Sequence, residues 1–392
     1  MSRPTLAFAD PVLITDTAAL TALCERLMAE PYVTIDTEFM RERTYYPELC
    51  VVQLAGVDDV AVIDTLAPGI DLTPLGLLLA DTSVVKVFHA ARQDVEIFLE
   101  LFGNVPAPLF DTQVAAMVAG FGDQVGYDSL VSSLTGGNID KAHRFSDWSV
   151  RPLSPAQVTY AAADVTYLRH VYERLRERLE RDGRLDWVAE EMAVLALPGT
   201  YRPDPDVMWE RLRPRTGNRR MLGLLRAAAA WREREAQRVN IPRQRLLKDE
   251  SLLEIAATAP DSSESLARVR GISRGFAEGR SGTGLVAALQ AAAALPEAEL
   301  PEAPRGKDGP RASPALVSLL KVLLAAKCEE HNVAPKLLAS SDDLDRLATE
   351  AEPDVPALQG WRRDMFGADA LALKAGAITL GVDGKRIKLL RV

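Results

Sequence analysis

The chain has 392 residues and a net charge of −9, and 47% of its residues are hydrophobic while 26% are charged. This length predicts two or three domains, and the composition is that of a globular protein rather than a disordered or fibrous one. No run approaches 18 uninterrupted apolar residues, and the N-terminus lacks the basic and apolar stretches of a signal peptide. We therefore expect neither a membrane span nor export.

The cysteines Cys24, Cys50 and Cys328 lie far apart with no ligand-like spacing. This spacing argues against a zinc site or thiol chemistry and fits a reducing compartment. We expect a cytoplasmic protein.

Strand and helix patterns alternate along the first 190 residues. Sheet-forming segments followed by helices are typical of a mixed α/β domain. The expected strands are 11–15, 32–39, 50–56, 59–64 and 84–88, and the expected helices include 17–30 and 90–103.

Strand patterns nearly vanish from about residue 209 onward. A helical unit near 215–295 is followed by LPEAELPEAPRGKDGPRASP, a stretch without periodicity that is typical of a linker, and then by a second helical unit. The two units have similar length and helix order, which suggests a weak internal repeat. The expected organisation is an α/β domain at 1–200, an all-α domain at 209–295, a linker at 296–313 and a second all-α domain at 314–392.

The charge is unevenly distributed. Between Trp209 and Lys248 there are twelve Lys or Arg against three Glu, a local balance of +9 that leaves −18 for the remainder. Such asymmetry predicts a basic binding surface on an acidic body. The alternative is a solvated helical face that happens to be rich in arginine.

The segment TIDTEFMRER, 34–43, places Asp36 and Glu38 on the same side of a predicted strand. Val33 and Ile35 lie on the other side. Taken alone, this alternation is equally typical of a half-exposed antiparallel strand with its polar side in water.

Two further segments carry acids beside helix starts. In FHAARQD, 88–94, Asp94 falls in the first turns of a helix, where an acid also simply favours the helix dipole. In SPAQVTYAAADVTYL, Ser154 and Gln157 form a capping box that fixes the helix start. Tyr160 and Asp164, at i and i+4, then share one helical face.

Together these segments supply four carboxylates and a tyrosine, without a cluster of His or Cys. Converging carboxylates cannot all stay ionised in a pocket without cations, and oxygen ligands favour Mg²⁺ or Mn²⁺. Two such ions roughly 3.5–4 Å apart suit displacement at a phosphodiester. The sequence therefore predicts a two-metal hydrolytic site.

The motifs DTE, HAxxxD and YxxxD resemble, in order and spacing, those of the DEDD superfamily of 3′–5′ exonucleases, tyrosine subclass. Within it, FSDWSVRPLSPAQVTYAAADVTYL and the two other motif regions closely resemble ribonuclease D, over about 12–190. The resemblance implies an RNase H-like fold and a Tyr160 that orients or helps deprotonate the attacking water. It implies these metal ligands: Asp36, Glu38, Asp94 and Asp164.

The helical tail also resembles known modules. Residues around 224–273 resemble an HRDC domain, and the last unit resembles a second, more divergent one. The basic segment then favours RNA contact, and its candidate residues are Arg215, Arg219, Arg220 and Arg226. In the first domain, Lys141, Arg144 and Arg151 are candidates for phosphates. Trp148 either stacks on a base or anchors its loop. His89 is expected either to be structural or to lie behind the metal ligands and support them.

The predicted function is a metal-dependent 3′–5′ exoribonuclease that releases nucleoside 5′-monophosphates. The expected partner is RNA, such as tRNA precursors and other structured RNAs with a 3′ overhang, and neither a membrane nor an obligate protein partner is indicated. One alternative is a DNA exonuclease of the same superfamily, which would differ in lacking a reader of the 2′-hydroxyl. Another is a non-catalytic RNA-binding module, against which the intact acids argue.

Overall fold

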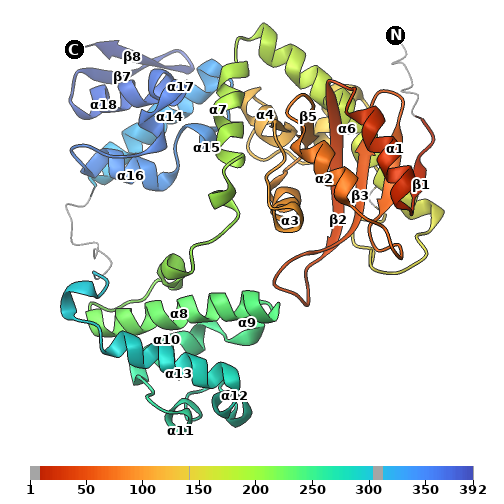
Figure 1. The fold of residues 1–392 in the computed structure, drawn as a ribbon. Helices are drawn as coiled ribbons and strands as arrows, with labels where there is room; N and C mark the ends of the chain where they lie inside the picture. Colours follow the sequence, from red (N-terminus) through yellow and green to blue (C-terminus); the bar gives the residue numbers. More distant parts are fainter. Residues whose placement is uncertain (1–8, 141, 303–311, 392) are drawn as a thin grey trace. The chain divides into compact units, whose positions relative to one another are not determined.

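The computed structural model describes residues 9–140, 142–302 and 312–391, which Figure 1 traces in chain order. Packing divides the chain into two compact units. The first comprises Met1–Glu38, Leu49–Pro198 and Pro310–Val392, and the second comprises Phe39–Glu48 and Gly199–Gly309. Half of the predicted linker, 303–311, lies outside the described residues.

A six-stranded mixed sheet forms the centre of the first unit. Its order is β1-β4-β3-β2-β5-β6, with β3 and β4 antiparallel, and with β1–β4, β2–β5 and β5–β6 parallel. All five predicted strands are confirmed, whereas β6 was missed because three residues are too few to show alternation. The strands are β1 Val12–Ile14, β2 Tyr32–Met40, β3 Glu48–Ala55, β4 Val60–Asp64, β5 Val85–Phe88 and β6 Leu109–Asp111.

Strand β2 runs through the middle of this sheet, between β3 and β5. Val33 and Ile35 are fully buried on one side. Thr34 is fully buried on the other side, where its hydroxyl donates to the carbonyl of Val165 in helix α6 at 2.8 Å. Because a helix covers the polar side of β2, the half-exposed antiparallel strand is excluded.

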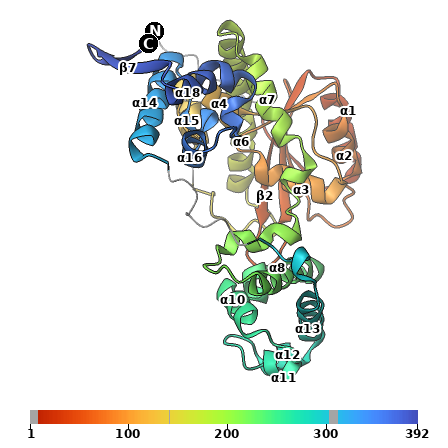
Figure 2. The ribbon, with the colours of Figure 1, turned by 90° about the vertical axis from the view of Figure 1, so that its left-hand side faces the viewer.

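Helices cover both faces of the sheet, with α1 and α2 on one face and α6 on the other (Figures 1 and 2). Helix α6 begins as predicted, because Ser154 and Gln157 make both hydrogen bonds of a capping box. Helix α3 ends at Gly103, whose φ of 76° glycine adopts without strain. These helices are α1 Thr17–Leu27, α2 Thr73–Ala80, α3 Arg92–Phe102, α4 Thr112–Val118, α5 Tyr127–Thr135, α6 Pro155–Arg181 and α7 Leu185–Leu195.

The C-terminal part of the chain packs against α4 and α7, within the first unit. The rings of Trp187 and Trp361 stack with their centres 4.6 Å apart, and the backbone N–H of Ala334 donates to the carbonyl of Met117 at 3.2 Å. The elements of this part are α14 Pro314–His331, α15 Pro335–Leu338, α16 Ser341–Thr349, α17 Gly360–Arg362, α18 Ala368–Lys374, β7 Ile378–Asp383 and β8 Arg386–Arg391.

The expectation of an all-helical C-terminal part is wrong at its last residues. Strands β7 and β8 form an antiparallel hairpin, in which Asp383 pairs with Arg386. The signal was present in the sequence, because an Asp-Gly pair between two alternating runs is a strong hairpin indicator.

The second unit is a helical bundle, and its existence was predicted correctly. Its core includes Leu252 and Ile255 from the stretch DESLLEIA, together with Leu225 and Leu285. The loop between β2 and β3 also belongs to this unit, because the backbone N–H groups of Tyr45 and Tyr46 donate to the side-chain oxygen of Asn240. The helices are α8 Arg219–Val239, α9 Arg243–Leu246, α10 Asp249–Thr258, α11 Ser263–Leu266, α12 Arg274–Glu278 and α13 Arg280–Ala293.

Along the described ranges, no helix combines the length and the apolar character that crossing a lipid bilayer requires.

Candidate active site

The structure brings together three of the four predicted carboxylates. Asp36 and Glu38 lie in the second half of β2, and Asp164 lies on α6. One carboxylate oxygen from each of the three lies within 4.8 Å of the others. Such a group of hard oxygen donors could hold a divalent cation.

The fourth acid, Asp94, lies outside that 4.8 Å group but beside it. It is buried in the first turn of α3, and the Thr37 hydroxyl donates to one of its carboxylate oxygens. Its negative charge adds to the effect of burial on the pKa of Glu38, and the charge of Asp36 adds in the same way to the pKa of Asp94. Thr37 was not predicted as a site residue, because a threonine in the middle of a strand carries no signal of its own in a single sequence.

Burial makes the ionised forms of these acids unfavourable. Burial raises the pKa of Asp164 to about 7. Burial, together with the negative charges of the neighbouring carboxylates, raises the pKa of Glu38 to about 9. Burial and the negative charge of Asp164 raise the pKa of Asp36, while burial and Asp36 raise that of Asp94. Within the described ranges no ion pair joins any of the four to a basic side chain.

Tyr160 lies one helical turn before Asp164, and both line the same hollow of about 390 Å³. The ring of His143 and the ring of Trp148 each lie 6.0 Å from the ring of Tyr160, measured between centres. Burial and the nearby Asp164 raise the pKa of the Tyr160 phenol. The phenol is therefore protonated near neutral pH, and it can donate a hydrogen bond to a water or a substrate oxygen.

Two lining residues were not assigned a role in the site from the sequence. The hydroxyl of Tyr127 donates to the backbone carbonyl of Asp164, which positions that turn of α6. His89, expected either to be structural or to support the ligands, lines the hollow too, and its Nδ1 lies 3.0 Å from the Thr112 hydroxyl. The sequence did not indicate this role, since Tyr127 lies 37 positions before Asp164.

Of the predicted RNA contacts in this domain, Arg144 lines the hollow that holds the acids. Lys141 lies outside the described residues. The Trp148 side chain is only 2% exposed. Of the two roles considered for Trp148, the structure favours the loop anchor over stacking on a base.

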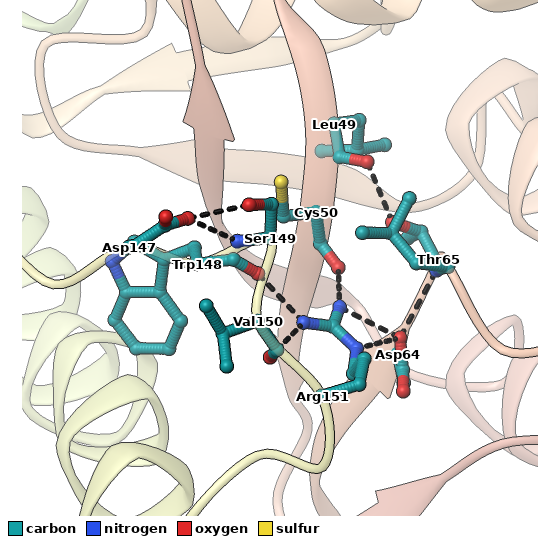
Figure 3. Close-up of polar contacts among 10 residues, drawn as sticks. Leu49, Cys50, Asp64, Thr65, Asp147, Trp148, Ser149, Val150 and Arg151 are labelled. Atoms are coloured by element: carbon teal, nitrogen blue, oxygen red, sulfur yellow. Dashed lines mark hydrogen bonds and ion pairs between the residues drawn. The ribbon is translucent and has the colours of Figure 1, made fainter.

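The guanidinium of Arg151 is engaged inside the domain, as Figure 3 shows. Its Nε and Nη2 atoms lie 2.8 and 2.7 Å from one carboxylate oxygen of Asp64. Its remaining contacts are to the carbonyls of Trp148 and Val150, from Nη1, and of Cys50, from Nη2. This geometry fits a structural contact that holds the loop before α6 against strands β3 and β4 better than it fits the predicted phosphate contact.

Of the four arginines predicted to contact RNA in the second unit, three are engaged in hydrogen bonds within the unit and one is not. Arg219, Arg220 and Arg226 donate to backbone carbonyls between Ala293 and Pro301, the segment that follows α13. Arg215 is exposed and makes neither a hydrogen bond nor an ion pair with any described residue.

The local balance of +9 overstated the free positive charge. Arg232 pairs with Asp249 at 2.7 Å, and Arg234 pairs with Asp206 at 2.7 Å. Both acids lie just outside the segment in which the charges were counted, so only the fold reveals the compensation.

Comparison with known proteins agrees with this site. A family model described as 3′-5′ exonuclease matches residues 11–180, and an HRDC domain model matches residues 221–289. Ribonuclease D of Gluconacetobacter diazotrophicus is 73% identical over 389 residues, 99% of each chain. Ribonuclease D of Granulibacter bethesdensis is 74% identical over 392 residues, 100% of this chain and 99% of its own. The crystal structure of Escherichia coli RNase D aligns with a TM-score of 0.81 at 32% identity, covering 94% of this chain and 99% of that one.

The exonuclease match covers β2, α3 and α6, the three elements that carry the acids. The fold and the site therefore assign the protein to the 3′–5′ exonucleases, and the chain also carries an HRDC domain. Identity extends over essentially the whole length of its relatives. The chain belongs to the ribonuclease D family and is a 3′–5′ exoribonuclease.

Proposed function

We propose that the protein trims the 3′ ends of structured RNAs that carry a 3′ overhang, such as tRNA precursors, and releases nucleoside 5′-monophosphates. The observation that carries this proposal is the carboxylate group of Asp36, Glu38 and Asp164, set beside Tyr160 in one hollow. The aligned Escherichia coli RNase D is described as an exoribonuclease involved in structured RNA processing, and that description supports the substrate class.

The donor set fits divalent cations. Three carboxylates converge without a basic partner among the described residues, so cations would relieve their mutual repulsion. Asp36, Glu38, Asp94 and Asp164 would hold two ions, and oxygen donors favour Mg²⁺ or Mn²⁺. When bound, such ions lower the pKa of a coordinated water and stabilise charge on a phosphodiester.

The role of Tyr160 is to orient the attacking water. A phenol whose pKa is raised above its usual value near 10 is a poor base at neutral pH. Its O–H is well suited to hold a water or a phosphate oxygen in line, and positioned groups of this kind are worth roughly 10²–10⁴-fold. Arg144, at the edge of the hollow, is placed to meet a phosphate.

The proposed domains are a catalytic domain at 1–200 and an HRDC domain at 209–295, followed by a linker at 296–313. Residues 314–392 form a second HRDC-like domain in this proposal, supported by helices α14 to α18 and extended by the hairpin. The site of action is the cytoplasm, in keeping with three free, buried cysteines.

The test is degradation of a tRNA-like RNA with a 3′ overhang, labelled at either end, alongside a DNA of the same sequence. We expect nucleotides to leave one at a time from the 3′ end of the RNA in Mg²⁺ or Mn²⁺, and no loss in EDTA. Asp164→Asn is the control for a contaminating nuclease. Equal or faster degradation of the DNA would replace the RNA assignment, and full activity in EDTA would overturn the metal assignment.

A further inference from the structure

Phe145 is the most exposed of the large hydrophobic side chains in the described parts of the chain. Its side chain is 92% exposed, compared with 78% for Val382, the next in order. Burial of an aromatic ring removes more apolar surface from water than burial of most side chains. A ring left in water therefore contributes none of that stabilisation to the fold. A ring this exposed is accessible to a planar ligand.

The neighbours of Phe145 fix it beside the active site. Arg144 lines the hollow that holds the acids, and its guanidinium carbon lies 5.4 Å from the centre of the Phe145 ring. On either side in sequence, His143 and the buried Trp148 contact the ring of Tyr160. The segment between α5 and α6 is therefore anchored next to Tyr160, while Phe145 projects from it.

Phe145 lies in a local turn, and its side chain is exposed to solvent. The backbone N–H of Ser146 donates to the carbonyl of His143 at 3.0 Å, and Nδ1 of His143 lies 3.2 Å from the Ser146 hydroxyl. Phe145 lies inside this turn, and no other aromatic ring lies against it among the described residues. The ring is thus held at the edge of the site with Arg144 as its neighbour.

We propose that Phe145, together with Arg144, is a stacking site for an unpaired nucleobase within the last few nucleotides of the RNA. This inference rests on the proposed function. Every base has a π-face, so an aromatic platform holds a strand without sequence preference, and an adjacent arginine adds a cation–π contact and a phosphate partner. Trp148, the aromatic that the sequence suggested for this role, is buried and cannot be reached.

The first experiment measures the affinity for a single-stranded RNA of twelve nucleotides in EDTA, which prevents cleavage. Phe145→Ala should bind about 5- to 150-fold more weakly, the range of one base–aromatic stack. Phe145→Trp should retain the affinity, and Phe145→Leu, which is apolar but has no π-face, should lose most of it. Val150→Ala is the matched control, because Val150 is also exposed, at 57%, on the same segment.

The second experiment places a single abasic nucleotide at each position of the same RNA in turn. At one position near the 3′ end it should weaken binding to the wild type by the same factor as Phe145→Ala, with no further loss when the two changes are combined. Equal affinity of wild type and Phe145→Ala, or abasic losses that are the same in both proteins at every position, would overturn the stacking site. A wild type that trims RNA normally in those cases leaves the exoribonuclease function intact, whereas a wild type that does not trim RNA refutes the function itself.

Discussion

Replacing Arg151 by alanine should destabilise the catalytic domain and leave its affinity for RNA unchanged. The side chain lies between the loop before α6 and the sheet, with an ion pair to Asp64 and hydrogen bonds to three carbonyls (Figure 3). A phosphate-binding arginine would behave in the opposite way, since its loss would weaken binding and spare stability.

The magnitude follows from burial. Removing one partner of a buried ion pair costs about 3–5 kcal/mol, because the other charge is left without compensation. The Arg151 side chain is 23% exposed and that of Asp64 is 10% exposed, so solvent reduces the cost toward the lower value. We expect a loss of about 3 kcal/mol, which is a large part of the 5–15 kcal/mol typical of a domain. Arg151→Lys keeps the charge but not the planar fork, and it should fall in between.

Urea unfolding followed by circular dichroism measures this loss, with Arg144→Ala as the control because Arg144 is exposed and lines the hollow. In the double variant with Asp64→Asn, part of the loss should be recovered, since no buried charge is left unpaired. A variant with wild-type stability and weakened binding of RNA in EDTA would show that Arg151 meets phosphate after all.

Four further results are expected. Neutralising any one of the four acids should lower turnover by orders of magnitude, while circular dichroism shows an intact fold. The variants are Asp36→Asn, Glu38→Gln, Asp94→Asn and Asp164→Asn. Near-normal turnover in two of them would exclude a two-metal site. Tyr160→Phe should lower turnover by roughly 10²–10⁴-fold, and full activity would assign the tyrosine to packing. In EDTA, stability should fall as pH rises from the usual Glu38 pKa of 4.5 toward about 9, because the folded form holds the proton more tightly, and Mg²⁺ should abolish this fall. Trp361→Ala should cost about 3–5 kcal/mol in urea unfolding, unlike Val382→Ala on the exposed hairpin.

The sequence predicted strand β2 and helix α6 well, because their signals are local. Alternation along β2, the capping box at Ser154 and the i, i+4 spacing of Tyr160 and Asp164 each act within one element. Resemblance to a family then joined the elements into one site. The convergence of three acids within 4.8 Å agrees with that assignment.

The assignments that lack support depended on contacts between distant residues. Arg151 meets Asp64 across 87 positions, and Arg219 meets Leu300 across 81. A single sequence gives the type and number of charged groups, but it does not show which of them are compensated by the fold. For the same reason the packing of α14 to α18 against α4 and α7 could not be anticipated.

Charge in the sequence is therefore weak evidence for binding, and charge left uncompensated after folding is strong evidence. Arg151 and Asp36 are both charged residues near the same helix, yet the fold satisfies every donor group of the first and raises the pKa of the second. Natural sequences agree with their folds at most positions, and the disagreements concentrate where function requires them. The exposed ring of Phe145 is the apolar counterpart of the buried acids, since the fold leaves the ring in water and, among the described residues, gives the acids no basic side chain as an ion-pair partner.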